Sequence, residues 1–235
     1  MKKLLATLTV LAAMAGPSAV ADALLWDNYP GGAEALDATD NISSERDTQV
    51  GPSLAIDDVV LPDNQYLITR FEWVGVRAPG FNYVAADLLI YDTSLNPIAT
   101  LSNLDYTATP VLPDPNPRPD RETYEGSIDL LGIGQAFNAP ADEFFIGVRL
   151  VGDSSGVESR NFTVISSRGD VVRGGSEAYF IGPIFGSFDF TPAGDAFGSP
   201  IDRLELAFRV FGERVPEPAS FALLALGGLA LLRRR

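Results

Sequence analysis

YEGSIDL, residues 124–130, is the clearest single indication of the fold class. From Tyr124 to Leu130, every second residue is apolar or glycine, and the residues between are Glu, Ser and Asp. Successive side chains of a β-strand point to opposite faces of the sheet. This alternation therefore predicts a strand with one buried face and one solvent-facing side.

The same period of two recurs on both sides of this stretch. Residues 144–150 (FFIGVRL) place four large apolar side chains on one face and Arg149 on the other, and residues 204–210 (LELAFRV) alternate with Glu205 and Arg209. Further strands are predicted at residues 23–26, 54–60, 66–76, 86–91, 97–101, 162–166 and 178–181. Short strands with turn residues between them, and no long helical stripe, predict an all-β fold: an antiparallel, jelly-roll-like β-sandwich.

The C-terminal stretch VPEPASFALLALGGLALLRRR, residues 215–235, differs from everything before it. Two prolines keep its start extended, and residues 219–232 are uncharged and apolar or small. A helix over residues 219–232 is about 21 Å long, short for a hydrocarbon core of roughly 30 Å. We predict a short transmembrane helix with Arg233, Arg234 and Arg235 on the cytoplasmic side. The alternative is a buried C-terminal core helix.

This tail resembles the PEP-CTERM sorting signal of exosortase-processed bacterial proteins. Pro216, Glu217 and Pro218 match the signature triplet, residues 219–232 the membrane segment, and the three terminal arginines the basic end. The resemblance implies cleavage by a membrane-embedded exosortase. It also implies passage from an inner-membrane-anchored intermediate to the cell envelope or exterior of a Gram-negative bacterium, often one that makes exopolysaccharide.

A second, looser resemblance concerns the domain in front of the tail. Residues 56–62 (IDDVVLP) and 68–75 (ITRFEWVG) are similar to a pattern in many PEP-CTERM cargo domains. Those domains are β-sandwiches, mostly without an assigned activity. The similarity implies the same fold here and no particular ligand.

The N-terminus has the organisation of a secretory signal peptide. Lys2 and Lys3 precede an apolar run over residues 4–15, and Ala19 and Ala21 form an A-x-A cleavage site. Such a segment directs a chain to the general secretion machinery and is removed. We therefore predict a signal peptide over residues 1–21, a β-sandwich domain over 22–214, and a sorting and anchor segment over 215–235.

The central segment is strongly acidic. Residues 22–214 keep 12 of the 17 basic side chains and 30 of the 31 acids, which gives a net charge near −18. Nucleic-acid binding needs clustered Lys and Arg, so this balance argues against that class of partner. The chain has no cysteine, and the core must hold the domain together without a disulfide.

Few residues offer chemistry for catalysis. Residues 152–156 (GDSSG) fit G-x-S-x-G, but the chain has no histidine to act as base and no apolar helix follows. These residues are interpreted as a turn, and no catalytic residue is assigned.

Metal binding is limited in the same way. Without His or Cys, calcium is the metal whose oxygen ligands the chain can supply. The acidic clusters are Asp37, Asp40 and Asn41; Asp57 and Asp58; and Asp142 and Glu143. None has a recognised ligand spacing, so no cofactor and no metal-binding residue is assigned, with calcium kept as the alternative.

Two functions remain from the sequence. The first is a non-catalytic protein of the envelope or extracellular matrix that associates with exopolysaccharide. Exposed aromatic residues would stack on its sugar rings, and the candidates are Trp26, Trp73, Tyr83 and Tyr106. Of these, Trp73 is expected in the core. The alternative is a glycan-acting hydrolase that uses distant carboxylates meeting in a cleft. A permanent membrane anchor is the alternative for the tail.

Overall fold

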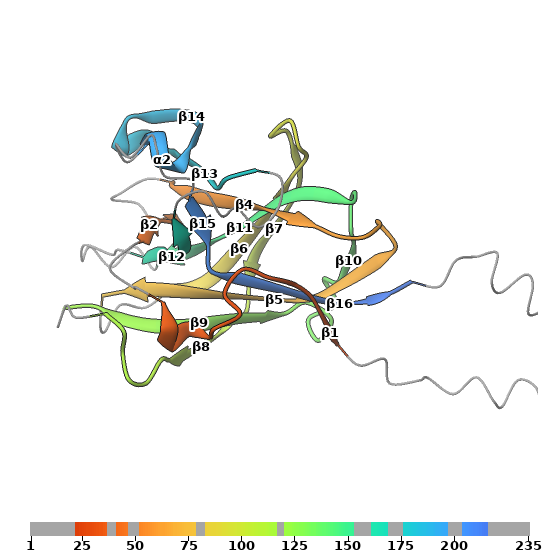
Figure 1. The fold of residues 1–235 in the computed structure, drawn as a ribbon, viewed down its shortest axis with the longest axis horizontal. Coiled ribbons are helices and arrows are strands. Elements are labelled where there is room, and N and C mark those ends of the chain that lie inside the picture. Colours follow the sequence, from red (N-terminus) through yellow and green to blue (C-terminus); the bar gives the residue numbers. More distant parts are fainter. Residues whose placement is uncertain are drawn as a thin grey trace, which may run out of the picture.

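A computed structural model describes residues 22–36, 41–46, 52–78, 83–116, 120–152, 161–168, 176–196 and 204–215. The described chain is mostly β-strand, arranged in a nine-stranded and a seven-stranded sheet. In Figure 1, β5 and β16 of the first sheet lie below β4 and β11 of the second. Among the described pairs, only β3 with β11 is parallel. The prediction of an all-β chain with antiparallel sheets is confirmed, whereas the jelly-roll connectivity stays a prediction.

The nine-stranded sheet is built around β5 (Tyr66–Arg77), which is 12 residues long. One edge of β5 pairs with β16 and then β12, and the other edge pairs with β10 and β9. The remaining strands extend this sheet outward. The bounds are β1 Ala23–Asp27, β2 Asn41–Ser43, β8 Thr107–Pro110, β9 Glu122–Asp129, β10 Phe137–Asn138, β12 Asn161–Arg168, β15 Leu204–Leu206 and β16 Phe208–Arg214.

The seven-stranded sheet has the order β14-β13-β4-β11-β6-β7, with β3 paired to β11. Its bounds are β3 Glu45–Arg46, β4 Leu54–Val60, β6 Tyr83–Tyr91, β7 Pro97–Leu104, β11 Glu143–Gly152, β13 Tyr179–Gly182 and β14 Ser187–Pro192. The described residues also form three single helical turns: η1 Ala33–Ala35, η2 Pro183–Phe185 and α2 Ala193–Ala196.

A bulge in β5 sets which of its side chains enter the core. Its pairing with β16 shifts register between Phe211 and Gly212, which leaves Thr69 as an extra residue on β5. Because one extra residue reverses the side-chain parity, Ile68 and Phe71 both point into the main core. Trp73 also lies in this core and is fully buried, as the sequence predicts.

The main core takes residues from both sheets, so the two sheets bury each other's inner faces. Phe71 and Tyr124 come from the nine-stranded sheet, and Phe144 and Ile146 from the seven-stranded one. Within the nine-stranded sheet, the stacked rings of Phe71 and Phe208 have centroids 5.5 Å apart. Burial of this apolar surface is the main source of stability in a chain without disulfides.

A buried chain of hydrogen bonds also crosses between the sheets. Trp73 Nε1 donates to the Tyr124 hydroxyl (3.2 Å), which donates to Asn161 Oδ1 (2.7 Å). Asn161 Nδ2 donates to the Ser44 carbonyl (2.9 Å), and Ser44 Oγ donates to the Val148 carbonyl on β11 (2.5 Å). Each donor in this series is satisfied, as buried polar groups require.

The prediction of a half-buried strand is wrong for residues 144–150 of β11. Alternation in residues 144–150 predicts one solvent-facing side, yet Phe145 on that side is 2% exposed. The outer face of β4, β6 and β11 carries a second cluster, Leu54, Ile56, Leu89 and Phe145. Tyr179, Ile181 and Phe190 of the β13–β14 hairpin pack against it, so the hairpin supplies the covering layer.

Residues 204–210 also depart from the simple alternation. Ala207 separates β15 from β16, so the run forms two strands instead of one. Glu205, predicted on the polar face, is 1% exposed. Its strand pairs with β12, and neighbouring elements cover the side chain.

The proline-rich segment 105–123 includes one short strand that was not among the predicted ones. Thr107–Pro110 forms β8, which pairs with β9 from Thr107 opposite Ser127 to Pro110 opposite Tyr124. Among the described strands β8 has no second partner. An edge strand tolerates a proline because one side of its backbone needs no hydrogen bond.

Candidate ligand site on the outer sheet face

A cavity of about 200 Å³ opens on the outer face of the seven-stranded sheet. Leu54, Tyr91 and Arg149 contribute from β4, β6 and β11, and Ile181 and Phe190 from the β13–β14 hairpin. The core-facing residues of these strands are a separate set, since side chains of one strand alternate between faces. The cavity therefore belongs to the outer face alone.

Arg149 is the positively charged residue of this cavity, and a buried carboxylate holds it in place. Arg149 Nε lies 3.0 Å from Asp87 Oδ2, and the two residues sit opposite each other on β11 and β6. Asp87 is fully buried and its Oδ1 also accepts a hydrogen bond from Asn103 N–H (3.0 Å). Asp87 thus fixes the guanidinium, whose side chain is 19% exposed.

Aromatic rings form the apolar part of the same face. Tyr91 and Phe190 meet edge to face, with centroids 5.0 Å apart and planes at 79°. Phe145 and Tyr179 repeat the arrangement at 5.5 Å and 88°. Burial raises the pKa of Tyr91, and the positive charge of Arg149 opposes this shift only in part. The Tyr91 hydroxyl therefore keeps its proton at neutral pH and remains a donor.

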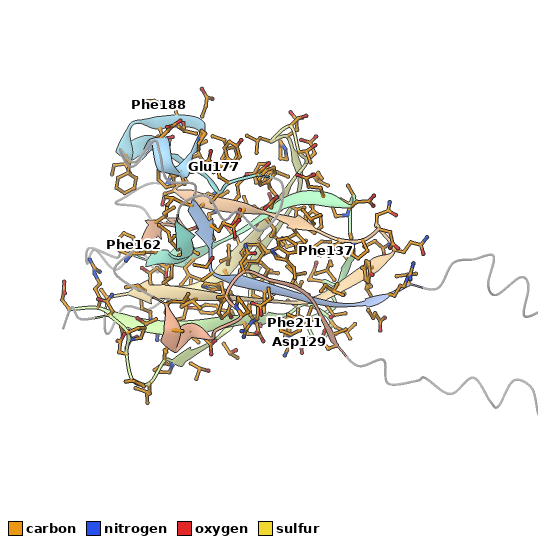
Figure 2. All side chains as sticks on the ribbon, viewed as in Figure 1. Asp129, Phe137, Phe162, Glu177, Phe188 and Phe211 are labelled. Carbon is orange, nitrogen blue, oxygen red and sulfur yellow. The ribbon has the colours of Figure 1, made fainter. Side chains whose placement is uncertain are left out.

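A larger cavity of about 350 Å³ lies at the end of the nine-stranded sheet where β1 begins and β16 ends. Three carboxylates line it, from Asp22, Asp129 and Glu213, together with Arg70. Arg70 pairs with Asp22 at 3.0 Å and stacks on the Phe211 ring at 3.9 Å. Figure 2 labels Asp129 and Phe211 close to each other in this region.

Two of these three carboxylates have structural partners. Asp129 Oδ1 accepts the Gly132 N–H at 2.8 Å and so shapes the turn after β9. Asp22 accepts a hydrogen bond from the Thr69 hydroxyl besides its ion pair with Arg70. These contacts favour a structural role for this end of the sheet.

Asp57 and Asp58, considered as calcium ligands from the sequence, are both fully buried. Asp57 Oδ2 accepts N–H groups of Leu206 (2.7 Å) and Asn28 (3.2 Å), which joins β4 to the opposite sheet. Burial raises the pKa of Asp57 well above its ordinary value. The Leu206 N–H opposes the shift, and the charges of Asp58 and Glu205 add to it.

Of the other acidic candidates, the structure describes Asn41, Asp142 and Glu143. Asp37 and Asp40 lie outside the described residues, as does most of the GDSSG stretch after Gly152. Asp142 is exposed and its neighbour Glu143 begins β11. Within the described ranges, no three acidic side chains gather in a way that would hold a metal ion.

The aromatic residues proposed for sugar stacking are mostly covered. Trp73 is fully buried, Tyr83 is buried, and Tyr106 packs partly buried against the main core. Trp26 is also partly buried against that core. Tyr106 nevertheless borders a cavity of about 220 Å³, and Tyr91 and Phe190 border the cavity on the outer face of the seven-stranded sheet. The sequence did contain a signal, because Asp87, Leu89 and Tyr91 fall at outward positions of the predicted strand 86–91.

The predicted sorting and processing residues lie outside the described ranges. These are Ala19 and Ala21 at the N-terminus, and Pro216, Glu217, Pro218, Arg233, Arg234 and Arg235 in the tail. The predicted helix over residues 219–232 is likewise not described. In the described part of the chain, no helix combines the length and apolar character needed to cross a membrane.

Comparison with protein families identifies one match. Residues 214–235 match the model of the PEP-CTERM protein-sorting motif, and this range includes the Pro216-Glu217-Pro218 triplet and the terminal arginines. No curated protein and no solved structure matched the chain.

Proposed function

We propose that this chain, which carries a PEP-CTERM protein-sorting motif, is a non-catalytic component of the cell envelope or extracellular matrix. The motif implies an exported protein that an exosortase sorts through a membrane-anchored intermediate. The general secretion machinery would remove residues 1–21, and the helix over 219–232 would hold the intermediate in the inner membrane. The domain over 22–214 would be the delivered cargo, with a β-sandwich scaffold.

The observation that carries this proposal is where the motif joins the domain. The match begins at Arg214, the last residue of β16. Ala23 at the start of β1 pairs with Gly212 near the end of β16. Both processing segments therefore connect to the same end of one strand pair, and cleavage at both leaves every described strand intact.

The net charge supports solubility outside the cell, and the outer sheet face supports association with a matrix polysaccharide. The net charge near −18 over residues 22–214 keeps the domain hydrated and soluble outside the cell. The outer face of the seven-stranded sheet offers a cavity with aromatic walls and one oriented arginine, which suits a small polar ligand with an apolar face. The cavity lies beside the β13–β14 hairpin, on the side of the sheet opposite the shared core.

The test is the mass and location of the protein in the producing organism. We expect protein recovered from the exterior to lack residues 1–21 and the apolar tail. Glu217→Ala removes the central residue of the triplet, and we expect it to accumulate in the membrane fraction with its tail intact. Glu213→Ala is the matched control, because Glu213 is the acid nearest to the motif and lies just outside the matched range.

Intact mass spectrometry separates the outcomes. Exterior protein that still ends in Arg235 would make the tail a permanent anchor and contradict the sorting proposal. Equal membrane retention of the Glu213→Ala control would show that the defect comes from the domain and not from the triplet.

A second candidate function is glycan hydrolysis in the 350 Å³ cavity, which Asp22, Asp129 and Glu213 line. Paired carboxylates are the groups that such chemistry needs. Release of reducing sugar that Glu213→Gln abolishes would favour this function over the non-catalytic one. The structural bonds of Asp22 and Asp129 are the reason that we place it second.

A further inference from the structure

The cavity on the outer face of the seven-stranded sheet has the size of a single-ring site. Its volume of about 200 Å³ is smaller than the roughly 300–1,000 Å³ typical of sites for drug-sized ligands. Its walls are aliphatic at Leu54 and Ile181 and aromatic at Tyr91 and Phe190, with Arg149 as the charged group. One ring-sized group that has both an apolar side and an anion would complement these walls.

Arg149 supplies donors for that anion. A guanidinium has five N–H donors in a fixed plane, and Nε uses one of them on Asp87. Among the described residues, no other acceptor is bonded to this guanidinium. Its remaining N–H groups match the two oxygens of a carboxylate, the geometry in which arginine forms paired, charge-assisted hydrogen bonds. Asp87 balances the charge, so recognition depends on this geometry more than on net charge.

The aromatic walls supply the second half of the recognition. The rings of Tyr91 and Phe190 pack edge to face with centroids 5.0 Å apart, and both residues border the cavity. A pyranose ring has faces made of C–H groups, which pack on such apolar surfaces. The Tyr91 hydroxyl remains protonated, as described above, and can donate to a ring hydroxyl or carboxylate.

We propose that this cavity binds a uronic acid unit of an acidic polysaccharide, with its carboxylate on Arg149 and its ring against Tyr91 and Phe190. The inference deepens the proposed function and rests on it for the source of the glycan. The chemistry itself depends only on the cavity. A neutral sugar would leave the arginine donors unpaired, and a simple anion would leave the aromatic walls uncovered.

The test is calorimetric titration of the full chain, in a polyoxyethylene detergent that carries no sugar, with tetragalacturonate. The matched ligand is the same tetramer with its carboxyl groups reduced. We expect binding of the acidic tetramer only. Arg149→Lys keeps the positive charge but loses the planar fork, and should weaken binding about tenfold. Phe190→Leu keeps an apolar side chain without the ring, and should weaken binding about fivefold.

The control variant is Arg77→Lys, which alters another arginine paired with a carboxylate, Glu122, on the nine-stranded sheet. It should bind as the unmodified chain does, and circular dichroism establishes that all three variants are folded. Equal binding of both tetramers, no binding at about 10 mM, or unchanged binding by Arg149→Lys would overturn the proposal. Because the titration uses unprocessed protein, a failure of sorting leaves this result unaffected, and the reverse also holds.

Discussion

Asp57 is a carboxylic acid in the interior of a protein without any described basic partner for it. Its contacts are N–H groups of Leu206, Asp58 and Asn28, and Asp58 and Glu205 are its acidic neighbours. Burying an ionised carboxylate without a counter-charge is costly, and such a group usually becomes protonated and neutral instead. Stability therefore depends on pH through this residue.

The sign of that dependence follows from the raised pKa of Asp57. Above about pH 4 the unfolded chain has released this proton while the folded chain still holds it, so a rise in pH favours unfolding. We expect the free energy of unfolding to fall between pH 5 and 8, by up to about 1.4 kcal/mol per pH unit for one proton. Asp57→Asn cannot titrate and should flatten this slope in urea denaturation series.

Asp92→Asn is the control for the pH experiment. Hydrogen bonds from the Asn96 side chain and backbone lower the pKa of Asp92, which places its titration below pH 5. The slope between pH 5 and 8 should not change in this variant. A slope that Asp57→Asn leaves as steep as before would assign the pH dependence to other groups.

Gly126 shows how a single missing side chain makes room for the core. A Cβ at this position would lie 2.2 Å from Trp73 Cζ2 on the neighbouring strand. The indole is fully buried and has nowhere to move, so overpacking is the expected result. We expect Gly126→Ala to lower the free energy of unfolding by about 3 kcal/mol, measured by urea denaturation.

Ser127→Ala is the comparison for this variant, because Ser127 is the next residue on β9 and its side chain is half-buried on the other face. Its effect should stay within about 0.5 kcal/mol. An equal loss in both variants would point to a general weakness of β9 and not to the contact with Trp73.

At the scale of elements, the buried hydrogen-bond chain from Trp73 to Val148 fastens β5 and β9 to β11 of the other sheet. The Tyr124 hydroxyl is its central group, since it accepts from Trp73 and donates to Asn161. Tyr124→Phe leaves the Trp73 N–H without this acceptor in a dry environment. We expect a loss of about 1–3 kcal/mol in the free energy of unfolding.

The control for Tyr124 is Tyr66→Phe. Tyr66 packs against the same core, and within the described ranges its hydroxyl makes no hydrogen bond. Both variants keep the aromatic ring, so the difference between their thermal unfolding temperatures measures the effect of losing the hydrogen-bonded hydroxyl of Tyr124. A Tyr66→Phe loss as large as that of Tyr124→Phe would contradict the role of the hydrogen-bond chain.

The elements also show where sequence reasoning reaches its limit. Strands were predicted at residues 124–130 and 54–60, and the structure has β9 at Glu122–Asp129 and β4 at Leu54–Val60, because alternation is a local property. The burial of Phe145 could not be predicted, because it depends on the β13–β14 hairpin folding over the outer face. β8 was missed because its proline lies at an edge, where the usual rule against proline does not apply.

The candidate site, too, could be predicted from the sequence only in part. Arg149 was predicted on the face opposite the core, which the structure confirms. Its partner Asp87 and the aromatic residues Tyr91 and Phe190 come from strands whose neighbours no local pattern specifies. An apolar residue at an outward position, such as Tyr91, is the one hint that the outer face is covered.

On the scale of the whole molecule, the tail and the domain differ in how they encode their roles. The sorting motif is contiguous, so the pattern over residues 214–235 could be recognised directly from the sequence. The cavity is assembled from five strands of one sheet and has no contiguous pattern. The outer face also carries an exposed rim, where Phe188 on β14 is 73% exposed and projects from the hairpin (Figure 2).

The pairing of β16 with a strand on each side has a mechanical consequence. A pull on the tail reaches the described domain at the end of β16, whose last residue is Arg214. β1 and β5 flank β16 through ladders of backbone hydrogen bonds, which share such a load along their length in shear. A pull perpendicular to the strands would instead break the backbone hydrogen bonds of each ladder one pair after another. A pull along β16 from Arg214 would therefore be shared by both ladders.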